Sequence, residues 1–269
     1  MGLEAKIARE TEFWDRRQAG GPARDPAEYR VGPGDRTDHS VPWLTYLGFP
    51  AQVQCMMDAV GALAGKRVLD LGTGTGFVAS LLAAQKAEVD AVDVSEASLA
   101  VARWRAEVSG VAGRIRFHAA PAERLPFPDG CFDAICGAFV LHHLDLGVAA
   151  PELRRVLRPG CRAAFIETIG NNRLLMTARA GLTGRMGIER ASSADEAPLA
   201  EPATAVLLGA FGGAVRFSFP STLVFRMLSY VPPLHTAPAR AVLGLADAVL
   251  HRFPALHRFS YYGVVSLGE

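Results

Sequence analysis

The sequence predicts an α/β fold, in which a doubly wound, mostly parallel sheet ends in an antiparallel strand and carries helices on both faces. Between residues 50 and 170, apolar stretches of strand length alternate five times with segments of helical periodicity. This alternation is typical of right-handed β–α–β units in a sheet that helices cover on both sides. The first strand leads directly into a glycine-rich turn, 68-VLDLGTGTGFVASLL-82, which predicts a ligand site at the carboxyl edge of the sheet.

Composition and charge restrict the class of protein. The chain has 269 residues, of which 50% are hydrophobic and 20% charged, so it can bury a sizeable core. The net charge of +1 gives no reason to expect a nucleic-acid partner. We expect a cytoplasmic protein without integral membrane association, because no run reaches the roughly 18 apolar residues of a membrane span and the charged N-terminus is unlike a signal peptide. Its arginine-rich and alanine-rich composition indicates GC-rich coding and a bacterial source.

The cysteines point to neither disulfides nor a metal site. None of the four forms a CxxC pair, and no histidine–cysteine spacing fits zinc. We therefore expect reduced thiols and no metal ligands. A homodimer is compatible with the sequence, but nothing in the sequence indicates one.

The N-terminal region is expected to form a helix and a strap that cover the site, over residues 1–49. Residues 3–18 have helical periodicity, and residues 20–36 are dense in glycine and proline and predict a loop. An aromatic cluster follows, made of Trp43, Tyr46 and Phe49. The remaining residues, 50–269, are expected to form the sheet domain.

The sheet domain begins with a helix whose apolar face runs from Val53 to Leu63 and which Gly65 ends. The expected strands are residues 67–71, 88–93, 114–118, 132–137 and 162–167. Helices are expected over 76–85 and 96–109, the second with Ser95 as its N-cap. A further helix ends at residue 157, before 158-RPG-160. Because proline fits only the first turn of a helix, Pro151 predicts that this helix starts late.

The C-terminal part is harder to interpret. Residues 171–213 are expected to be irregular, and residues 214–219 and 260–267 to be the last strands. The stretch 223–258 between those strands is apolar and mostly helical in pattern. Residues 171–258 therefore predict a partly helical cap on the sheet domain.

The glycine-rich turn favours one kind of ligand. The GxGxG spacing and the absence of a following Lys-Ser/Thr disfavour a P-loop and weaken the case for a nicotinamide site. A carboxylate at Asp70 is expected to repel a pyrophosphate, and an acid at Asp93, where the second strand ends, can accept hydrogen bonds from ribose hydroxyls. A ribose with a cationic or zwitterionic tail meets these requirements, as in S-adenosylmethionine.

Four motifs in order carry a resemblance to a known family. They are VLDLGTGTG, the acid at Asp93, 122-AERLPFPDGCFDAICGAFVLHHL-144 and 152-ELRRVLRPG-160. Over residues 50–170 the chain resembles class I S-adenosylmethionine-dependent methyltransferases, which implies a Rossmann-like fold. Within them it resembles the broad branch that includes the ubiquinone/menaquinone biosynthesis methyltransferases. The cofactor-binding residues that the resemblance implies are Asp70, Gly72, Thr73, Gly74, Gly76, Asp93, Val94, Ala122, Glu123 and Phe139.

The resemblance assigns these residues to parts of the cofactor, with two departures. The glycines carry the methionine part with Asp70 shaping their loop, Asp93 holds the ribose, residues 120–123 line the adenine, and Phe139 lies under the cofactor. Where the family often has an acid that accepts from the adenine amino group, this chain has Pro121, so adenine rests on the Ala122 and Glu123 backbone or Glu123 substitutes. The usual PGG turn is PGC here.

Candidate catalytic residues follow the fourth and fifth strands. His142 and His143 are each either a general base or a packed histidine. Glu167 either faces the substrate or anchors a loop through backbone N–H groups. Tyr46, with Trp43, and Asn171 are candidate substrate contacts, and the arginines of residues 173–190 form either a cover for an anionic substrate or a solvated loop.

We therefore expect a methyltransferase acting on O, N or activated C of a small metabolite, of which lipophilic or aromatic compounds are the favoured class. Three alternatives stay open: a nicotinamide-dependent oxidoreductase, a non-catalytic S-adenosylmethionine-binding protein, and a nucleic-acid methyltransferase. The near-neutral charge and the lack of a DPPY-like motif disfavour the last of these.

Overall fold

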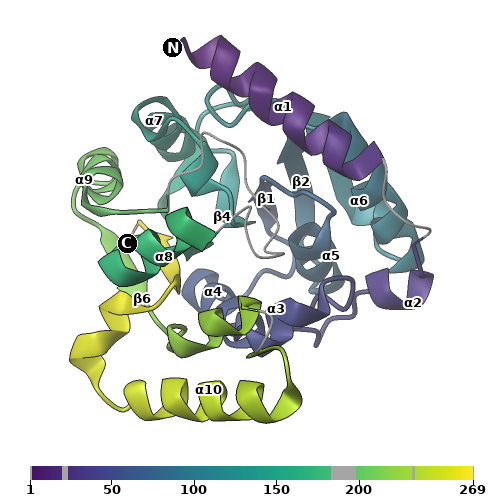
Figure 1. Cartoon of the computed structure of the whole chain (residues 1–269). Coiled ribbons are helices and arrows are strands. Elements are labelled where there is room, and N and C mark those ends of the chain that lie inside the picture. Colours follow the sequence, from purple (N-terminus) through teal and green to yellow (C-terminus); the bar gives the residue numbers. More distant parts are fainter. Residues whose placement is uncertain (1, 20–23, 183–197, 232–233, 269) are drawn as a thin grey trace.

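A computed structural model describes residues 2–19, 24–182, 198–231 and 234–268, except for the side chains of Trp43 and Tyr230 (Figure 1). A central sheet is covered by helices, with the N-terminal helix α1 across one end of the molecule and α10 at the other. Both helices lie outside the alternating strand–helix segment that the sequence analysis identified.

The central sheet has seven strands in the order β3-β2-β1-β4-β5-β7-β6. Their bounds are β1 Arg67–Leu71, β2 Glu88–Asp93, β3 Ile115–Ala119, β4 Phe132–Ala138, β5 Leu157–Thr168, β6 Val215–Ser218 and β7 Tyr262–Leu267. Strands β1 to β5 pair in parallel, and β7 is antiparallel to both β5 and β6. The predicted fold class, doubly wound and mostly parallel with an antiparallel last strand, is confirmed.

Helices cover both faces of this sheet, as the two hydrophobic cores show. The α-helices are α1 Leu3–Ala19, α2 Pro26–Tyr29, α3 Pro42–Tyr46, α4 Phe49–Val60, α5 Phe77–Ala84, α6 Glu96–Val108, α7 Leu146–Val156, α8 Arg173–Leu182, α9 Glu201–Ala210 and α10 Ala237–Leu250. Short 3₁₀ helices are η1 Ala112–Arg114, η2 Leu141–His143, η3 Phe225–Tyr230 and η5 Pro254–Phe259. Val68 packs into one core and Leu69 into the other, which is the alternation expected of a strand buried on both faces.

Helix α7 differs from its prediction. It begins at Leu146, with the Asp145 side chain accepting from the Gly147 N–H, and continues through Pro151 to Val156. A proline at this position removes only one backbone hydrogen bond, whereas Leu153, fully buried, holds the helix on the sheet. Packing therefore outweighs the local preference for a late start.

Strand β5 and the segment after it also differ from prediction. Residues 158–160 belong to an irregular start of β5, because the register passes from Phe132↔Leu157 to Ala134↔Arg162. Within 171–213, which was expected to be irregular, α8 and α9 are regular helices. Helix α9 inserts the fully buried Leu207 into the core beside α7. The predicted cover of arginines extends into residues 183–197, outside the described residues.

The strap after α1 is fastened to α6 by a buried ion pair. Arg105 is fully buried, and its guanidinium donates to both carboxylate oxygens of Asp38, at 3.1 and 3.0 Å, and to the Ser40 hydroxyl. Its cationic carbon lies 4.4 Å from the centre of the Tyr29 ring. Since removing one partner of a buried pair leaves an uncompensated charge, this contact fixes where the strap crosses the sheet domain.

Candidate active site

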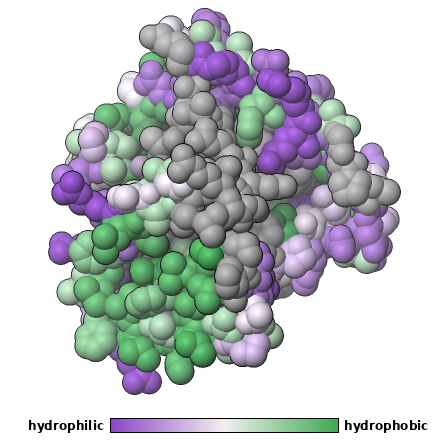
Figure 2. Space-filling view, in the orientation of Figure 1, coloured by the Kyte–Doolittle hydropathy of each residue, from purple (hydrophilic) through white to green (hydrophobic). Residues whose placement is uncertain are grey.

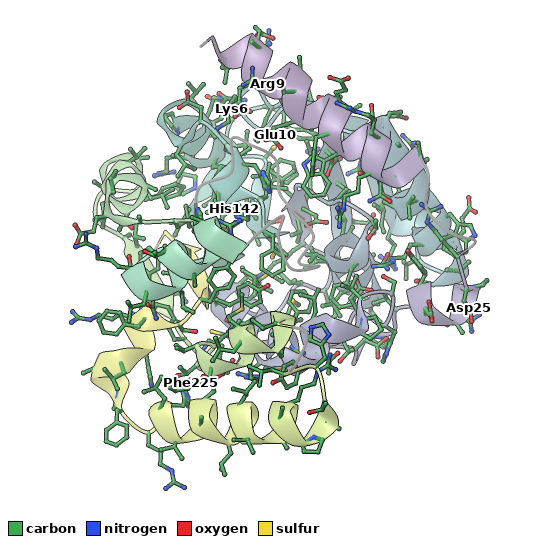
Figure 3. All side chains as sticks on the ribbon, viewed as in Figure 1. Lys6, Arg9, Glu10, Asp25, His142 and Phe225 are labelled. Carbon is green, nitrogen blue, oxygen red and sulfur yellow. The ribbon has the colours of Figure 1, made fainter. Side chains whose placement is uncertain are left out.

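A cavity of about 330 Å³ opens at the carboxyl edge of the parallel strands, with α1 on its other side. Its main lining residues are Gly72, Gly74 and Thr75 after β1, Asp93 and Val94 at the end of β2, Ala120, Ala122 and Glu123 after β3, Phe139, Val140, His143 and Leu144 after β4, and Lys6, Ile7, Glu10, Trp14 and Gln18 of α1. Figure 3 shows Lys6 and Glu10 on the side of α1 that faces the sheet. The predicted place of the ligand site is thus where the cavity lies.

The three glycines of the loop have different roles, although all have a positive φ. A side chain at Gly72 would overlap Val140, and one at Gly76 would come within 2.7 Å of the Ala102 Cβ, so both are needed for packing. At Gly74, φ is +51° and nothing lies within 4 Å of where a Cβ would stand. Gly74 lines the cavity, so the backbone there is bare toward a ligand.

Asp93 ties the glycine loop to the start of α6. Its carboxylate accepts from the Gly74 N–H at 2.8 Å and from the Ser95 N–H at 2.9 Å. Burial raises the pKa of Asp93, and these backbone donors offset part of the rise. Each carboxylate oxygen has a second lone pair, so Asp93, which lines the cavity, can accept further hydrogen bonds from a ligand.

Asp70 occupies a different position from the one expected of a ligand contact. It is fully buried at the end of β1 and does not line the cavity. Burial raises the pKa of Asp70 to about 7, and the neighbouring Thr73 hydroxyl and Ala79 N–H offset only part of this effect. The direct repulsion of a pyrophosphate by Asp70 was therefore the wrong inference, because the carboxylate lies behind the loop. Thr73 and Gly76 are likewise absent from the cavity wall.

Phe139 forms part of the cavity wall in a strained conformation. Its φ is +58°, which is uncommon for a bulky residue. Its N–H donates to the Ile166 carbonyl at 2.7 Å, and its ring packs against Phe49 and Tyr262 at centroid distances of 5.9 and 5.0 Å. The surrounding contacts hold this conformation, and strain of this kind clusters at ligand sites.

Glu167 anchors the turn after β4. Its carboxylate is fully buried and accepts from the N–H groups of Val140 and Leu141, at 2.9 and 2.6 Å, and its other oxygen lies 2.6 Å from the His142 Nδ1. Neither Glu167 nor His142 lines the cavity. Of the two roles considered for Glu167, the geometry matches loop anchoring, and His142 shares in it.

His143 is the predicted catalytic residue that reaches the cavity. Its Nδ1 lies 3.3 Å from the Glu10 carboxylate, and its ring packs edge-on against Trp14 of α1, with centroids 5.6 Å apart. The Trp14 indole N–H donates to the same Glu10 carboxylate at 3.2 Å. Helix α1 and the turn after β4 thus bring a nearly buried carboxylate to an imidazole at the ligand cavity.

Comparisons with known proteins agree with this geometry. Residues 68–160 match a family model described as "Methyltransferase domain". The chain carries a class I S-adenosylmethionine-dependent methyltransferase domain. Domains of this class use S-adenosylmethionine, so the cofactor expected from the sequence is the one that belongs to the matched family.

Curated relatives match about two fifths of the chain. A demethylmenaquinone methyltransferase from Thermus thermophilus is 47% identical over 107 residues, which are 39% of this chain and 48% of that protein. A ubiquinone/menaquinone biosynthesis C-methyltransferase from Geobacter sulfurreducens is 42% identical over 107 residues, or 38% of this chain and 42% of that protein. The match thus spans less than half the length of these relatives.

Solved structures extend the likeness of fold to the whole chain. A geranyl diphosphate C-methyltransferase from Streptomyces coelicolor has a TM-score of 0.55 at 17% identity and covers 97% of this chain and 96% of its own. A phosphoethanolamine N-methyltransferase from Haemonchus contortus has a TM-score of 0.60 at 14% identity and covers 99% of this chain and 50% of its own. The [4+2]-cyclase SpnF has a TM-score of 0.55 at 21% identity and covers 97% of this chain and 93% of its own. Its name describes a different activity on the same fold. None of the proteins named here is a nicotinamide-dependent oxidoreductase.

Three of the residues that the resemblance assigns to the adenine, Ala120, Ala122 and Glu123, line the cavity. The Glu123 carboxylate accepts from the Asp145 N–H at 3.0 Å, beside the start of α7. One Glu123 oxygen is therefore already engaged by the backbone.

The predicted substrate residues lie away from this cavity. Asn171 lines a separate surface pocket with Leu250 and Phe259. The Tyr46 hydroxyl donates to the Arg240 carbonyl of α10 at 3.1 Å. Both were interpreted as substrate contacts, and neither lines the cavity. Tyr46 instead packs against α10, where the Arg240 guanidinium carbon lies 5.5 Å from the centre of its ring. The Trp43 side chain lies outside what the structure describes.

The sequence analysis did not select the α1 residues. Only a helix over residues 3–18 was predicted there, and Ile7 and Trp14 lie on one apolar face of it. Glu10 stands between them, three residues after one and four before the other, so it lies on the same face. A charged residue on an apolar face was the available signal.

Among the described residues, no group of three histidine, cysteine, aspartate or glutamate side chains could hold a metal ion.

Proposed function

We propose that this protein moves a methyl group from S-adenosylmethionine to O, N or activated C of a small, lipophilic or aromatic metabolite. The observation that carries the proposal is the cavity between the glycine loop and α1, which joins the cofactor residues Gly74 and Asp93 to His143 in one space. Two of the similar proteins support an acceptor of this class, because one is named a demethylmenaquinone methyltransferase and the other was solved with geranyl diphosphate.

The cavity residues fit the cofactor. The space left open at Gly74 admits the methionine end against bare backbone, Asp93 receives ribose hydroxyls, and Ala122 lies beside the adenine. Phe139 supplies an apolar wall. When bound, S-adenosylmethionine supplies an electrophilic methyl group on a sulfonium centre. The chain's own task is then to align the acceptor and exclude water, and α1 contributes to both by closing one side of the cavity.

His143 is the residue placed to accept a proton from the acceptor, where the acceptor must lose one. The Glu10 carboxylate lies 3.3 Å from the His143 Nδ1, without a hydrogen bond to it, and Trp14 contacts both groups. Glu167 is a positioning residue, since its hydrogen bonds to Val140 and Leu141 fix the turn that presents His143. In this proposal residues 1–49 act as the cover of the site, as the sequence predicted.

The cysteines and the helices bear on where the protein acts. All four cysteines are free, which supports the cytoplasm as the compartment. No described helix is long and apolar enough to cross a membrane.

Calorimetric titration with S-adenosylhomocysteine tests the cofactor site. We expect micromolar binding that Asp93→Ala weakens at least tenfold, or about 1.4 kcal/mol. Asp58→Ala, an exposed acid on α4, is the matched control and leaves binding unchanged. Absence of binding by correctly folded wild-type protein would exclude this cofactor.

Turnover with an acceptor panel tests the reaction. A naphthoquinol, a simple phenol, an aliphatic amine and a prenyl diphosphate represent activated C, O, N and an isoprenoid chain. We expect a mass increase of one methyl group on a lipophilic member of the panel. Cofactor binding without any turnover across the panel would favour a protein that uses S-adenosylmethionine without transferring its methyl group.

A further inference from the structure

Helix α10 is oriented with its acidic residue, Asp247, inward and its large apolar residues outward. Asp247 is 1% exposed, whereas Val242 and Leu245 are 67% and 66% exposed and Val249 is 47% exposed. Val242, Leu245 and Val249 follow at spacings of three and four residues, so they form one stripe along the helix. A helix on the surface of a water-soluble protein ordinarily has the opposite arrangement.

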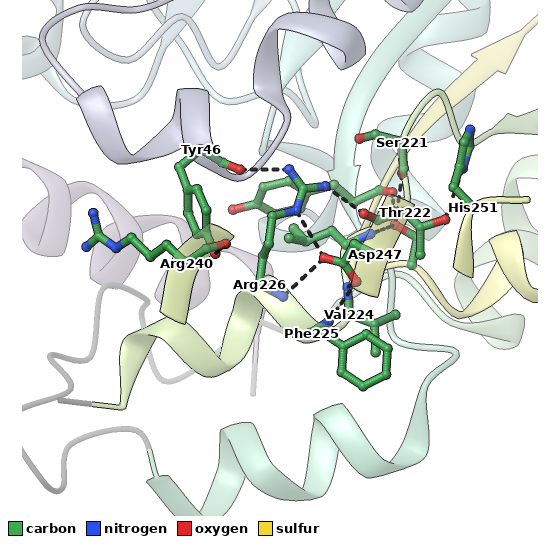
Figure 4. A network of polar contacts seen from close by, with 12 residues as sticks. Tyr46, Ser221, Thr222, Val224, Phe225, Arg226, Arg240, Asp247 and His251 are labelled. Atoms are coloured by element: carbon green, nitrogen blue, oxygen red, sulfur yellow. Dashed lines mark hydrogen bonds and ion pairs between the residues drawn. The ribbon is translucent and has the colours of Figure 1, made fainter. Parts of the chain in front are cut away.

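A network of hydrogen bonds fixes this orientation. The Asp247 carboxylate accepts from the backbone N–H groups of Val224, Phe225 and Arg226, at 3.1, 2.8 and 3.1 Å. It also pairs with the Arg226 guanidinium at 3.0 Å, and that guanidinium reaches the carbonyls of Tyr46 and Thr222 (Figure 4). Rotating the helix would leave Asp247 and three backbone donors without partners. The outward apolar stripe is therefore a property of the folded state.

Neighbouring residues widen the stripe into an apolar surface. Phe225 of η3 and Phe253, just after α10, are 38% and 55% exposed and line one shallow groove with Val242, Leu245 and Val249. We call these five residues the α10 face. Figure 2 shows apolar side chains gathered over this end of the molecule, where Figure 1 places α10. Surfaces of this kind on soluble proteins mark interaction sites.

The charges around the α10 face have one sign. Arg240, Arg252 and Arg258 are exposed in the same segment. The sequence from residue 219 to 268 contains a single acidic residue, Asp247, and its carboxylate is buried against Arg226. An apolar stripe flanked by arginines, with no exposed acid in its segment, is complementary to a surface with an apolar interior and negative headgroups.

We propose that the α10 face docks this protein peripherally on an anionic lipid surface. In this arrangement Leu245 and Val249 enter the boundary between headgroups and acyl chains, and the exposed Arg252 and Arg258 meet the headgroup phosphates. Arg240, which packs over the Tyr46 ring on the inward side of α10, takes no part. A second copy of this chain is the other occupant with matching apolar area. A two-fold interface would bring the same arginines of both copies together. Because the segment has no exposed acid, the repulsion between these positive charges would be uncompensated.

Vesicle co-sedimentation tests the proposal with the full chain. We expect binding to vesicles of phosphatidylcholine with 30% phosphatidylglycerol, and at least tenfold weaker binding to phosphatidylcholine alone. Leu245→Ser with Val249→Ser should weaken binding to the anionic vesicles at least tenfold. Val206→Ser with Leu208→Ser, two similarly apolar residues of α9 that are each 38% exposed, is the matched control and should change binding less than twofold. Thermal melts followed by circular dichroism confirm that the variants fold.

The arginines provide a second, independent measurement. Arg252→Gln with Arg258→Gln should weaken binding to the anionic vesicles and reduce its dependence on salt, while leaving the melting temperature unchanged. Absence of binding by wild type, or equal binding to both vesicle types, would overturn the proposal. So would a concentration-dependent dimer, seen by light scattering, that Leu245→Ser with Val249→Ser abolishes, because a second copy would then cover the α10 face.

Discussion

Glu10 of the first helix and His143 of the turn after β4 lie 3.3 Å apart at the wall of one cavity. The two residues come from opposite sides of the site, since α1 packs on α6 while His143 follows the central strand β4. Their contact links the N-terminal cover to the catalytic edge of the sheet, and it makes the role of α1 measurable.

Substitutions at this pair should lower methyl transfer more than cofactor binding. A general base contributes roughly 10²- to 10⁴-fold, so we expect His143→Ala to reduce kcat about 100-fold or more for an acceptor that loses a proton. Glu10→Gln, which keeps the shape but removes the charge, should reduce it about tenfold. Steady-state kinetics measures both effects, with the exposed His39→Ala as control. Unchanged kcat in His143→Ala would show that the reaction needs no base from this residue.

Alanine at two neighbouring glycines should separate ligand binding from folding. At Gly74 a Cβ meets nothing but carries the strain of a positive φ, so Gly74→Ala should cost about 1 kcal/mol of stability and weaken S-adenosylhomocysteine binding at least tenfold. At Gly76 a Cβ would come within 2.8 Å of the Ala102 backbone, so Gly76→Ala should cost about 2–4 kcal/mol.

Urea denaturation and calorimetry measure the two effects of these alanines separately. If Gly74→Ala bound the ligand as tightly as wild type, the bare backbone at that position would have no part in binding. If Gly76→Ala were as stable as wild type, the packing role assigned to Gly76 would be wrong.

Asp70 should make stability fall as pH rises toward neutrality. Its folded pKa of about 7 lies above the ordinary 3.8, so the folded state keeps a proton that the unfolded chain releases. Its contribution is therefore full below about pH 4 and is lost as pH rises to about 7. Asp70→Asn cannot titrate. Relative to that variant, wild type should lose stability of the order of 4 kcal/mol between about pH 4 and pH 8, at 1.36 kcal/mol per unit.

Urea denaturation at a series of pH values measures the difference for Asp70. The exposed Asp58→Asn serves as the control, because it should follow wild type at every pH. A constant difference between wild type and Asp70→Asn over this range would contradict the raised pKa.

Asp90 should have the opposite pH dependence. It is buried and pairs with Arg67, Arg116 and His118, and although burial alone would raise its pKa, these partners lower the pKa of Asp90 to about 2. The stabilisation is present above about pH 4 and is lost as pH falls toward 2. Because Arg116 is 58% exposed, solvent screening reduces it to about 1–2 kcal/mol. Acid unfolding of Asp90→Asn should lack this phase, and an identical acid transition would refute the assignment.

Much of the methyltransferase domain could be predicted from local sequence. The apolar residues of 67–71 and 88–93 predicted β1 and β2 within a residue, because a strand buried on both faces is mainly apolar, although Asp70 and Asp90 interrupt these two. Ser95 was predicted as an N-cap, and its hydroxyl accepts from the Ser98 N–H. The start of α7 was missed, because the Asp145 cap and the burial of Leu153 together outweigh the local cost of Pro151.

The sequence by itself determined the glycine loop after the first strand and the acid at Asp93 at the end of the second. These depend on backbone conformations that adjacent residues impose, so a contiguous motif specifies them. Only the tertiary structure decided that Glu10 reaches His143, that Tyr46 lies away from the cavity, and that α10 faces its apolar stripe outward. Periodicity shows which residues share a helix face, but which side of the helix meets the core depends on contacts between segments far apart in the chain.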